Sequence, residues 1–86
     1  TQGYNRMMFN ILDLNVQAPA AVRDFVQKLP QIISGGLTVE AIAKARADSF
    51  FTPSGRLDAP GFNNSYQRLY SDQRSRAGVW DYRRRL

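Results

Sequence analysis

The chain has 86 residues, with 12 Lys and Arg against 7 Asp and Glu, and a formal net charge of +5. It contains no Cys and no His, which excludes a disulfide framework, thiolate or imidazole metal sites, and Cys or His as a catalytic nucleophile or base. A chain of this length forms one small domain at most, and its core is thin for independent stability.

Residues 1–18 carry two conflicting patterns, one of a helix and one of a strand. The apolar residues with helical spacing are Met8, Ile11 and Leu12, and those that alternate with polar residues are Leu12, Leu14 and Val16. We expect a short helix near residues 5–13, and the choice between helix and strand stays open for the segment as a whole.

Residues 19–34 have the clearest helical pattern of the chain. Their apolar side chains recur on one helix face: Val22, Phe25, Val26, Leu29, Ile32 and Ile33. Pro19 suits the first helical turn. Because Pro30 removes a backbone hydrogen bond in the interior, we expect the helix to kink or split there. Gly35 and Gly36 then end it, since glycine adopts the left-handed C-terminal conformation without penalty.

A second helix is predicted over residues 38–51. Thr38 can cap its N-terminus, and Glu40 in the first turn complements the helix dipole. Its narrower apolar stripe consists of Val39, Ile42, Ala43 and Phe50. We therefore expect two antiparallel helices joined by a Ser-Gly-Gly turn, which together form a helical hairpin.

Residues 52–63 are rich in Pro, Gly, Ser and Asn, and they are predicted to form a loop or linker. A helix is expected again over residues 64–82, where Asn64 and Gln67 resemble a capping box. Its stripe includes one polar residue and consists of Tyr66, Leu69, Tyr70, Gln73, Ala77 and Trp80. Gly78 weakens this helix, so we expect a break near residue 77.

The predicted fold is therefore all-α, with a short helical hairpin, a C-terminal amphipathic helix and an extended basic tail. The hairpin belongs to an N-terminal segment of residues 1–51. The linker follows over residues 52–63, and residues 64–86 form the helix and its Arg-rich arm. Because the core is small, the chain is expected to be marginal as an autonomous domain and partly extended rather than globular in isolation.

The C-terminal segment combines positive charge with aromatic residues. From Arg68 to the end, six Arg accompany only two Asp. This combination is typical of single-stranded nucleic-acid binding, and equally of protein interfaces, where Trp, Tyr and Arg dominate the binding energy. A third interpretation is a solvated helix whose aromatic residues pack on the domain itself.

Residues 40–56 resemble part of a DNA-binding helix-turn-helix, over about a fifth of the chain. The residues that match the E-x-I-A … S-x-x-T spacing of that family are Glu40, Ile42, Ala43, Ser49 and Thr52. Three positions depart from it. Asp48 stands where the turn needs an apolar residue, Arg46 stands at a site that is usually apolar, and Pro53 falls inside the recognition helix. These departures favour an ordinary helix followed by a loop.

The sequence offers no constellation of catalytic groups. The seven carboxylates are scattered, without the pair or cluster that acid–base catalysis or a metal ion needs. The Ser34-Gly35-Gly36 turn lacks the lysine and spacing of a phosphate loop. Thr1 is a candidate N-terminal nucleophile, but a chain of this size could scarcely bury such a site. We therefore expect no enzyme, and no catalytic, cofactor-binding or metal-binding residue.

We expect a non-enzymatic structural or accessory subunit that docks on a larger macromolecular assembly, with a virion component as the first choice. The alternative is a small basic nucleic-acid-binding protein that contacts phosphates through its C-terminal arginines. The expected partner-binding residues are Phe25, Leu29, Ile33, Phe50, Tyr66, Tyr70, Trp80 and Tyr82. The expected contacts to phosphate or to an acidic partner are Arg68, Arg74, Arg76, Arg83, Arg84 and Arg85.

No apolar run approaches the roughly 20 residues of a membrane-spanning helix, and no signal-peptide pattern is visible. We therefore expect a location in the cytoplasm, or within a virion or another intracellular assembly. Contact with a membrane surface is disfavoured, because Gln73 and Gly78 interrupt the C-terminal stripe.

Overall fold

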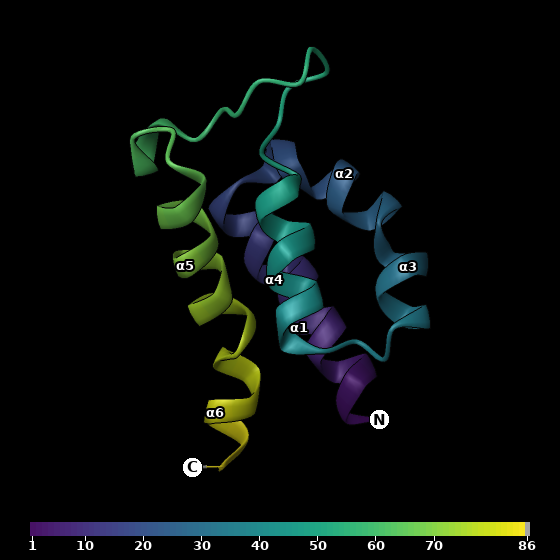
Figure 1. Cartoon of the computed structure of the whole chain (residues 1–86). Helices are drawn as coiled ribbons and strands as arrows, with labels where there is room; N and C mark the ends of the chain where they lie inside the picture. Colours follow the sequence, from purple (N-terminus) through teal and green to yellow (C-terminus); the bar gives the residue numbers. More distant parts are fainter. Residues whose placement is uncertain (86) are drawn as a thin grey trace.

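The computed structural model describes the backbone of residues 1–85 and the side chains of residues 1–82, and this part of the chain is helical with connecting loops (Figure 1). Two short 3-10 helices, η1 and η2, lie between the α-helices. The elements in chain order are α1 (Gln2–Gln17), η1 (Pro19–Ala21), α2 (Val22–Gln27), α3 (Leu29–Ser34), α4 (Val39–Asp48), η2 (Pro60–Phe62), α5 (Tyr66–Ala77) and α6 (Val79–Arg85). The predicted all-α class is confirmed.

The ambiguous N-terminal segment is one long helix, α1. Thr1 caps it, because its side chain accepts a hydrogen bond of 3.1 Å from the backbone N–H of Tyr4. The helix therefore extends beyond the expected residues 5–13 at both ends. The strand-like alternation has a different meaning: Leu14 is buried in the core, whereas Leu12 and Val16 lie on the exposed side of the helix.

The segment expected as one helix with a weak point at Pro30 is split into η1, α2 and α3. Lys28 separates α2 from α3, and Pro30 falls in the first turn of α3, where its missing N–H is tolerated. The predicted split is confirmed. The following turn contains Gly36 at φ +94° and Leu37 at φ +56°.

The predicted hairpin is not the main packing unit. Helix α4 packs most extensively against α5, while α1, α2 and α3 contact its other sides (Figure 1). The reason is the composition of α4, in which every second residue from 41 to 47 is alanine, so that neighbours can approach closely around it. Thr38 caps α4 as predicted, by accepting a hydrogen bond of 3.1 Å from the N–H of Ala41. The helix ends at Asp48, three residues earlier than expected.

The C-terminal part differs from the prediction at its start and at its end. The N-cap of α5 is Ser65, which accepts a hydrogen bond from the N–H of Arg68, and not Asn64. Asn64 instead accepts a hydrogen bond of 2.8 Å from the N–H of Ala59 and closes the loop before the helix. The extended tail is wrong as well: Gly78 keeps a right-handed conformation, so a second helix, α6, follows directly and continues to Arg85.

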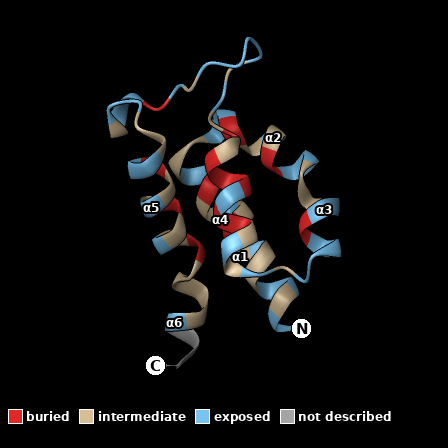
Figure 2. Ribbon diagram, in the orientation of Figure 1, coloured by how far each residue is buried: buried red, intermediate tan, exposed pale blue. Residues whose placement is uncertain are grey.

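Two apolar clusters form the core, and the buried residues lie on the stretches of helix that adjoin one another (Figure 2). The larger consists of Leu14, Ala21, Phe25, Ile32, Ile42, Ala43, Ala45 and Ala77, and the smaller of Ala47, Ala59 and Leu69. Half-buried Phe50 and Tyr70 pack against both. The Cα radius of gyration is 12.3 Å, close to the roughly 12 Å of a compact domain of this length. The partly extended shape that we expected is therefore not observed.

Within residues 1–85, no helix has the length and apolar character needed to cross a bilayer.

Candidate interaction surface

A buried arginine, Arg46 of α4, is the centre of a polar cluster between α1, α4 and α5. Its side chain is 0% exposed. The guanidinium Nε donates to Gln73 Oε1 and Nη1 to Asn10 Oδ1, both at 2.8 Å. Nη2 donates to Asp13 Oδ2 at 2.6 Å and to Gln17 Oε1 at 3.1 Å. One side chain thus connects three helices, and we call these five residues the Arg46 cluster.

A second layer of polar groups completes the Arg46 cluster. Gln73 donates to Asp72 at 3.2 Å, and Arg76 donates from Nε to the same Asp72 oxygen at 2.9 Å. The amide of Asn10 donates to the backbone oxygen of Ala77 at 3.3 Å. Burial lowers the pKa of Arg46, and the contact with Asp13 partly offsets this effect. Because these bonds are directed at protein groups, the cluster is a structural element and not a ligand site.

This cluster was not predicted from the sequence, although two signals in the sequence point to it. Arg46 interrupts a stretch of alanines at a position where the helix-turn-helix pattern has an apolar residue, and Gln73 occupies a place in the apolar stripe of α5. A polar residue aligned with a buried face requires a partner. Neither signal identifies the partners of Arg46, which come from α1 as well as from α5.

The predicted phosphate-binding arginines do not form one open cationic surface in the described part of the chain. Arg74 pairs with Glu40 at 2.7 Å, and Arg76 pairs with Asp72. The pKa of Glu40 is lowered by a backbone hydrogen bond at the start of α4 and by the nearby Arg74. Arg68 is exposed on α5. The side chains of Arg83–Arg85 lie outside the described residues.

The predicted hairpin residues are divided between the core and the surface. Phe25 is fully buried in the larger core cluster, so it is not part of an exposed surface, contrary to our expectation. Leu29 and Phe50 are half-buried and pack against the core. Ile33 is exposed. The expected apolar hairpin face is therefore mostly used within the chain, because α2 and α3 cover α4 with it.

The C-terminal aromatic residues pack mainly on neighbouring side chains of the same chain. Tyr66 and Tyr70 stack at a centroid distance of 6.4 Å, and Trp80 lies 6.3 Å from Phe9 of α1. Tyr82 is exposed. Tyr66, Tyr70 and Trp80 therefore pack on the domain itself, as in the third interpretation of the C-terminal segment.

Tyr66 also takes part in a polar contact with α4. Its hydroxyl donates to Asp48 Oδ1 at 2.7 Å, and Asp48 accepts a second bond from Lys44 Nζ at 2.6 Å. Partial burial, followed by this hydrogen bond, raises the pKa of Tyr66 to about 12. The contact joins the start of α5 to the end of α4.

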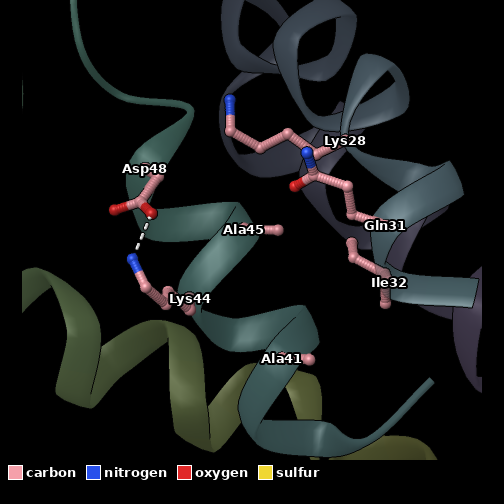
Figure 3. Close-up of a pocket in the computed structure, with 7 residues that line it drawn as sticks. All are labelled: Lys28, Gln31, Ile32, Ala41, Lys44, Ala45 and Asp48. Atoms are coloured by element: carbon pink, nitrogen blue, oxygen red, sulfur yellow. Dashed lines mark hydrogen bonds and ion pairs between the residues drawn. The ribbon is translucent and has the colours of Figure 1, made fainter. Parts of the chain in front are cut away.

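A small groove of about 250 Å³ lies between α3 and α4 (Figure 3). Its walls contain both lysines of the chain, and they consist of Lys28, Gln31, Ile32, Ala41, Lys44, Ala45 and Asp48. The volume is below the roughly 300–1,000 Å³ of typical ligand pockets. Its one carboxylate, Asp48, is engaged by Lys44 and Tyr66. Among the described residues, no group of three or more Asp or Glu is placed to hold a metal ion.

The outer face of α1 is the surface feature that stands out. Four apolar residues recur there at every fourth position, and all are exposed: Tyr4 (54%), Met8 (38%), Leu12 (62%) and Val16 (85%). The other exposed residues of this helix are uncharged amides, Gln2, Asn5 and Asn15. We call these seven residues the α1 outer face.

The charged residues of α1 point away from this face into the molecule. Arg6 pairs with Asp81 at 2.8 Å, and Asp13 pairs with Arg46. By contrast, α4 exposes Glu40 and α5 exposes Arg68. Helix α1 thus directs its charged groups inward, beside the buried Leu14, and exposes apolar groups on its outer side, where a surface helix usually carries polar and charged residues. The sequence signal was the four-residue spacing from Tyr4 to Val16, which the strand-like alternation concealed.

Comparisons with known proteins give no further indication of function: a scan against models of protein families found no match, and searches of curated proteins and of solved structures found no similar one.

Proposed function

We propose that the protein is a non-enzymatic structural subunit that associates with a protein partner through the α1 outer face. The observation that carries this proposal is the row of four exposed apolar residues, with no exposed charged residue beside it, along the longest helix of the described chain. Interface cores are depleted of charge and enriched in aromatic residues and Met, and this surface has all three properties. Exposed apolar patches on monomeric proteins can mark interaction sites.

The position of the α1 outer face gives further support. Its helix is held in place from behind by the Arg46 cluster and by the pair between Arg6 and Asp81, so the surface is presented on a fixed element. A pre-ordered surface binds at a lower entropic cost. In comparison, two of the three described C-terminal arginines, Arg74 and Arg76, are engaged in ion pairs, which favours a protein partner over nucleic acid.

A photo-crosslinking amino acid at position 12, introduced in the cells that make the protein, tests the proposal. Leu12 lies in the middle of the α1 outer face, and we expect adducts of discrete mass from it. The matched control places the same group at Gln27, an exposed residue of α2. If position 12 gives no more adduct than position 27, the α1 outer face is not an association surface.

A further inference from the structure

We infer that the partner at the α1 outer face is a second copy of this chain, bound with the two α1 helices antiparallel. This inference rests on the proposed function, because it names the occupant of the same surface. Its basis is the symmetry of the face. A two-fold interface requires that if residue i contacts residue j of the partner, then j contacts i.

The arrangement of the α1 outer face meets this requirement. Tyr4 and Val16 lie equally far from Asn10, near the middle of the helix, on opposite sides, and so do Met8 and Leu12. An antiparallel pair therefore brings Met8 against Leu12 and the large Tyr4 against the smaller Val16, twice each. Side chains at every fourth position also form a ridge on the surface of a helix. In the commonest class of helix packing, such a ridge fits into the groove between the equivalent ridges of another helix.

The polar residues of the face follow the same symmetry. Asn5 and Asn15 are also equidistant from the middle of α1, and both are exposed. Asn5 and Asn15 flank the apolar row on opposite sides, so in the antiparallel pair the two Asn5 lie at one edge of the contact and the two Asn15 at the other. An amide side chain can both donate and accept, so it can bond to water or to polar groups of the other copy at these edges. The pair would thus have an apolar centre and a polar rim, as interfaces do.

Charge distinguishes a second copy from other occupants. Each copy has a net charge of +5, so two copies repel at long range, and the repulsion is smallest where no charged residue lies at the contact. The exposed residues of α1 carry no charge, so this is a face where like copies can meet. The same neutrality disfavours an anionic membrane or a nucleic acid, since both are bound through Lys and Arg.

The size of the face sets the expected strength of association. Four apolar side chains bury less surface than the roughly 800 Å² per partner that stable complexes bury. We therefore expect weak association, visible as a rise of the weight-average mass toward twice the chain mass with increasing concentration. Analytical ultracentrifugation of the purified full chain, over a concentration series from micromolar to millimolar, measures this.

Three variants test the surface and its register. Leu12→Glu should weaken self-association by about tenfold or more, because it puts a charge in the apolar centre. Ile33→Glu is the matched control, since Ile33 is an equally apolar and 53% exposed residue of α3 that should not matter. Circular dichroism verifies that each variant is folded, and Val16→Glu, at an 85% exposed position, replaces Leu12→Glu if that variant fails to fold.

The register is tested by mixing two variants. Met8→Lys and Leu12→Glu chains should each associate poorly alone. Their mixture should recover association, because antiparallel helices place the introduced lysine of one variant beside the introduced glutamate of the other. A mixture that stays monomeric overturns the antiparallel register. A wild-type chain that stays monomeric at every concentration, or a dimer that Leu12→Glu leaves intact, overturns the second copy as occupant.

The two proposals can fail separately. If the purified chain is monomeric while position 12 crosslinks to a different protein in cells, the inference of a second copy is wrong and the proposed function stands. If the chain is monomeric and position 12 gives no adduct, both are wrong.

Discussion

Arg46 places a full positive charge in the middle of the helices, and the consequence for stability depends on its partners. Moving a charge out of water costs several kcal/mol, and a buried pair offsets this cost only when its geometry is good and its remaining groups are bonded. Here Asn10, Asp13, Gln17 and Gln73 accept from the three guanidinium nitrogens. The cluster therefore specifies how α1, α4 and α5 fit together, since any other packing leaves the charge unpaired.

Arg46→Met should destabilise the protein by about 3–5 kcal/mol, because it leaves the buried acceptors of Asn10 and Gln73 without a donor and removes the nearer of the two cations that pair with Asp13. Chemical denaturation measures the free energy of unfolding. The matched control is Lys44→Met on the same helix, where the lysine is 68% exposed and its loss should cost less than about 1 kcal/mol. Equal midpoints for the two variants would contradict a structural role of the cluster.

Tyr66 should ionise at a higher pH in the folded protein than in the unfolded chain. Its pKa is raised to about 12, first by partial burial and then by the hydrogen bond to Asp48, whereas an unfolded tyrosine ionises near pH 10. Its contribution to stability is therefore fully present below pH 10 and is lost as the pH rises through 12. The absorbance of tyrosinate during an alkaline titration should show a step near pH 12, and Tyr66→Phe should remove it.

The control for this titration is circular dichroism at each pH, which shows whether the helices persist. If Tyr66→Phe leaves the titration near pH 12 unchanged while the protein is still helical, the contact between Tyr66 and Asp48 is contradicted.

At the scale of the elements, the helices followed from local sequence, but their packing did not. Apolar spacing, Thr38 as a cap, Pro30 as a break and Gly78 as a weak point predicted most element types and several boundaries. The partners of α4 were not predictable in the same way. Alanine at every second position makes a helix that neighbours can pack around, and such a pattern has no marked apolar side that would select one partner.

The candidate site was less predictable than the fold. A basic and aromatic C-terminal segment is a conspicuous pattern, but ion pairs to Arg74 and Arg76 and the stacking of Tyr66 on Tyr70 use it within the chain. These contacts depend on how the helices pack, which local sequence does not determine. The α1 outer face was equally hard to predict from the sequence, because the exposure of Leu12 can be recognised only once Leu14 is known to be buried.

The two glycines that join helices should respond to alanine in opposite ways. Gly78, between α5 and α6, has φ −89°, and a Cβ there meets its nearest neighbours at 3.4 Å or more. Gly78→Ala should therefore raise the free energy of unfolding by about 0.5–1 kcal/mol, because alanine restricts the unfolded chain. Gly36 has open space around it but φ +94°, so Gly36→Ala should lower stability by about 1 kcal/mol or more.

Thermal and chemical denaturation of both variants measure these effects. If Gly36→Ala is the more stable of the two, the left-handed turn between α3 and α4 is not a feature of the folded protein.

At the scale of the whole molecule, five basic and five acidic residues take part in the described ion pairs. The two of them that belong to α1, Arg6 and Asp13, point into the molecule. The excess positive charge is carried by other elements, and among the residues outside these pairs are Arg23 of α2, Lys28, Arg56 and Arg68. This distribution leaves one long helix face neutral on a basic protein. Positive charge elsewhere opposes nonspecific association, while the neutral face permits association in one orientation.

The two ends of the described chain are connected by Arg6 of α1 and Asp81 of α6. The guanidinium donates to both carboxylate oxygens at 2.8–3.3 Å, and its Nη1 donates to the backbone oxygen of Leu37 at 2.7 Å. Both side chains are less than one-fifth exposed. Gln2 of α1 also donates to Asp81, at 3.5 Å, so the described polar contacts between α6 and α1 all pass through Asp81.

Asp81→Asn should therefore release α6 without unfolding the rest. We expect hydrogen exchange in residues 79–82 to accelerate by about tenfold, which corresponds to the loss of roughly 1.4 kcal/mol of local stability, while exchange in α4 changes little. Mass-spectrometric hydrogen exchange measures both segments in one sample. The control is Glu40→Gln, which removes an exposed pair with Arg74 and should leave exchange in residues 79–82 unchanged. If Asp81→Asn accelerates α4 as much as α6, the last helix is part of one cooperative unit and opens only when the whole protein unfolds.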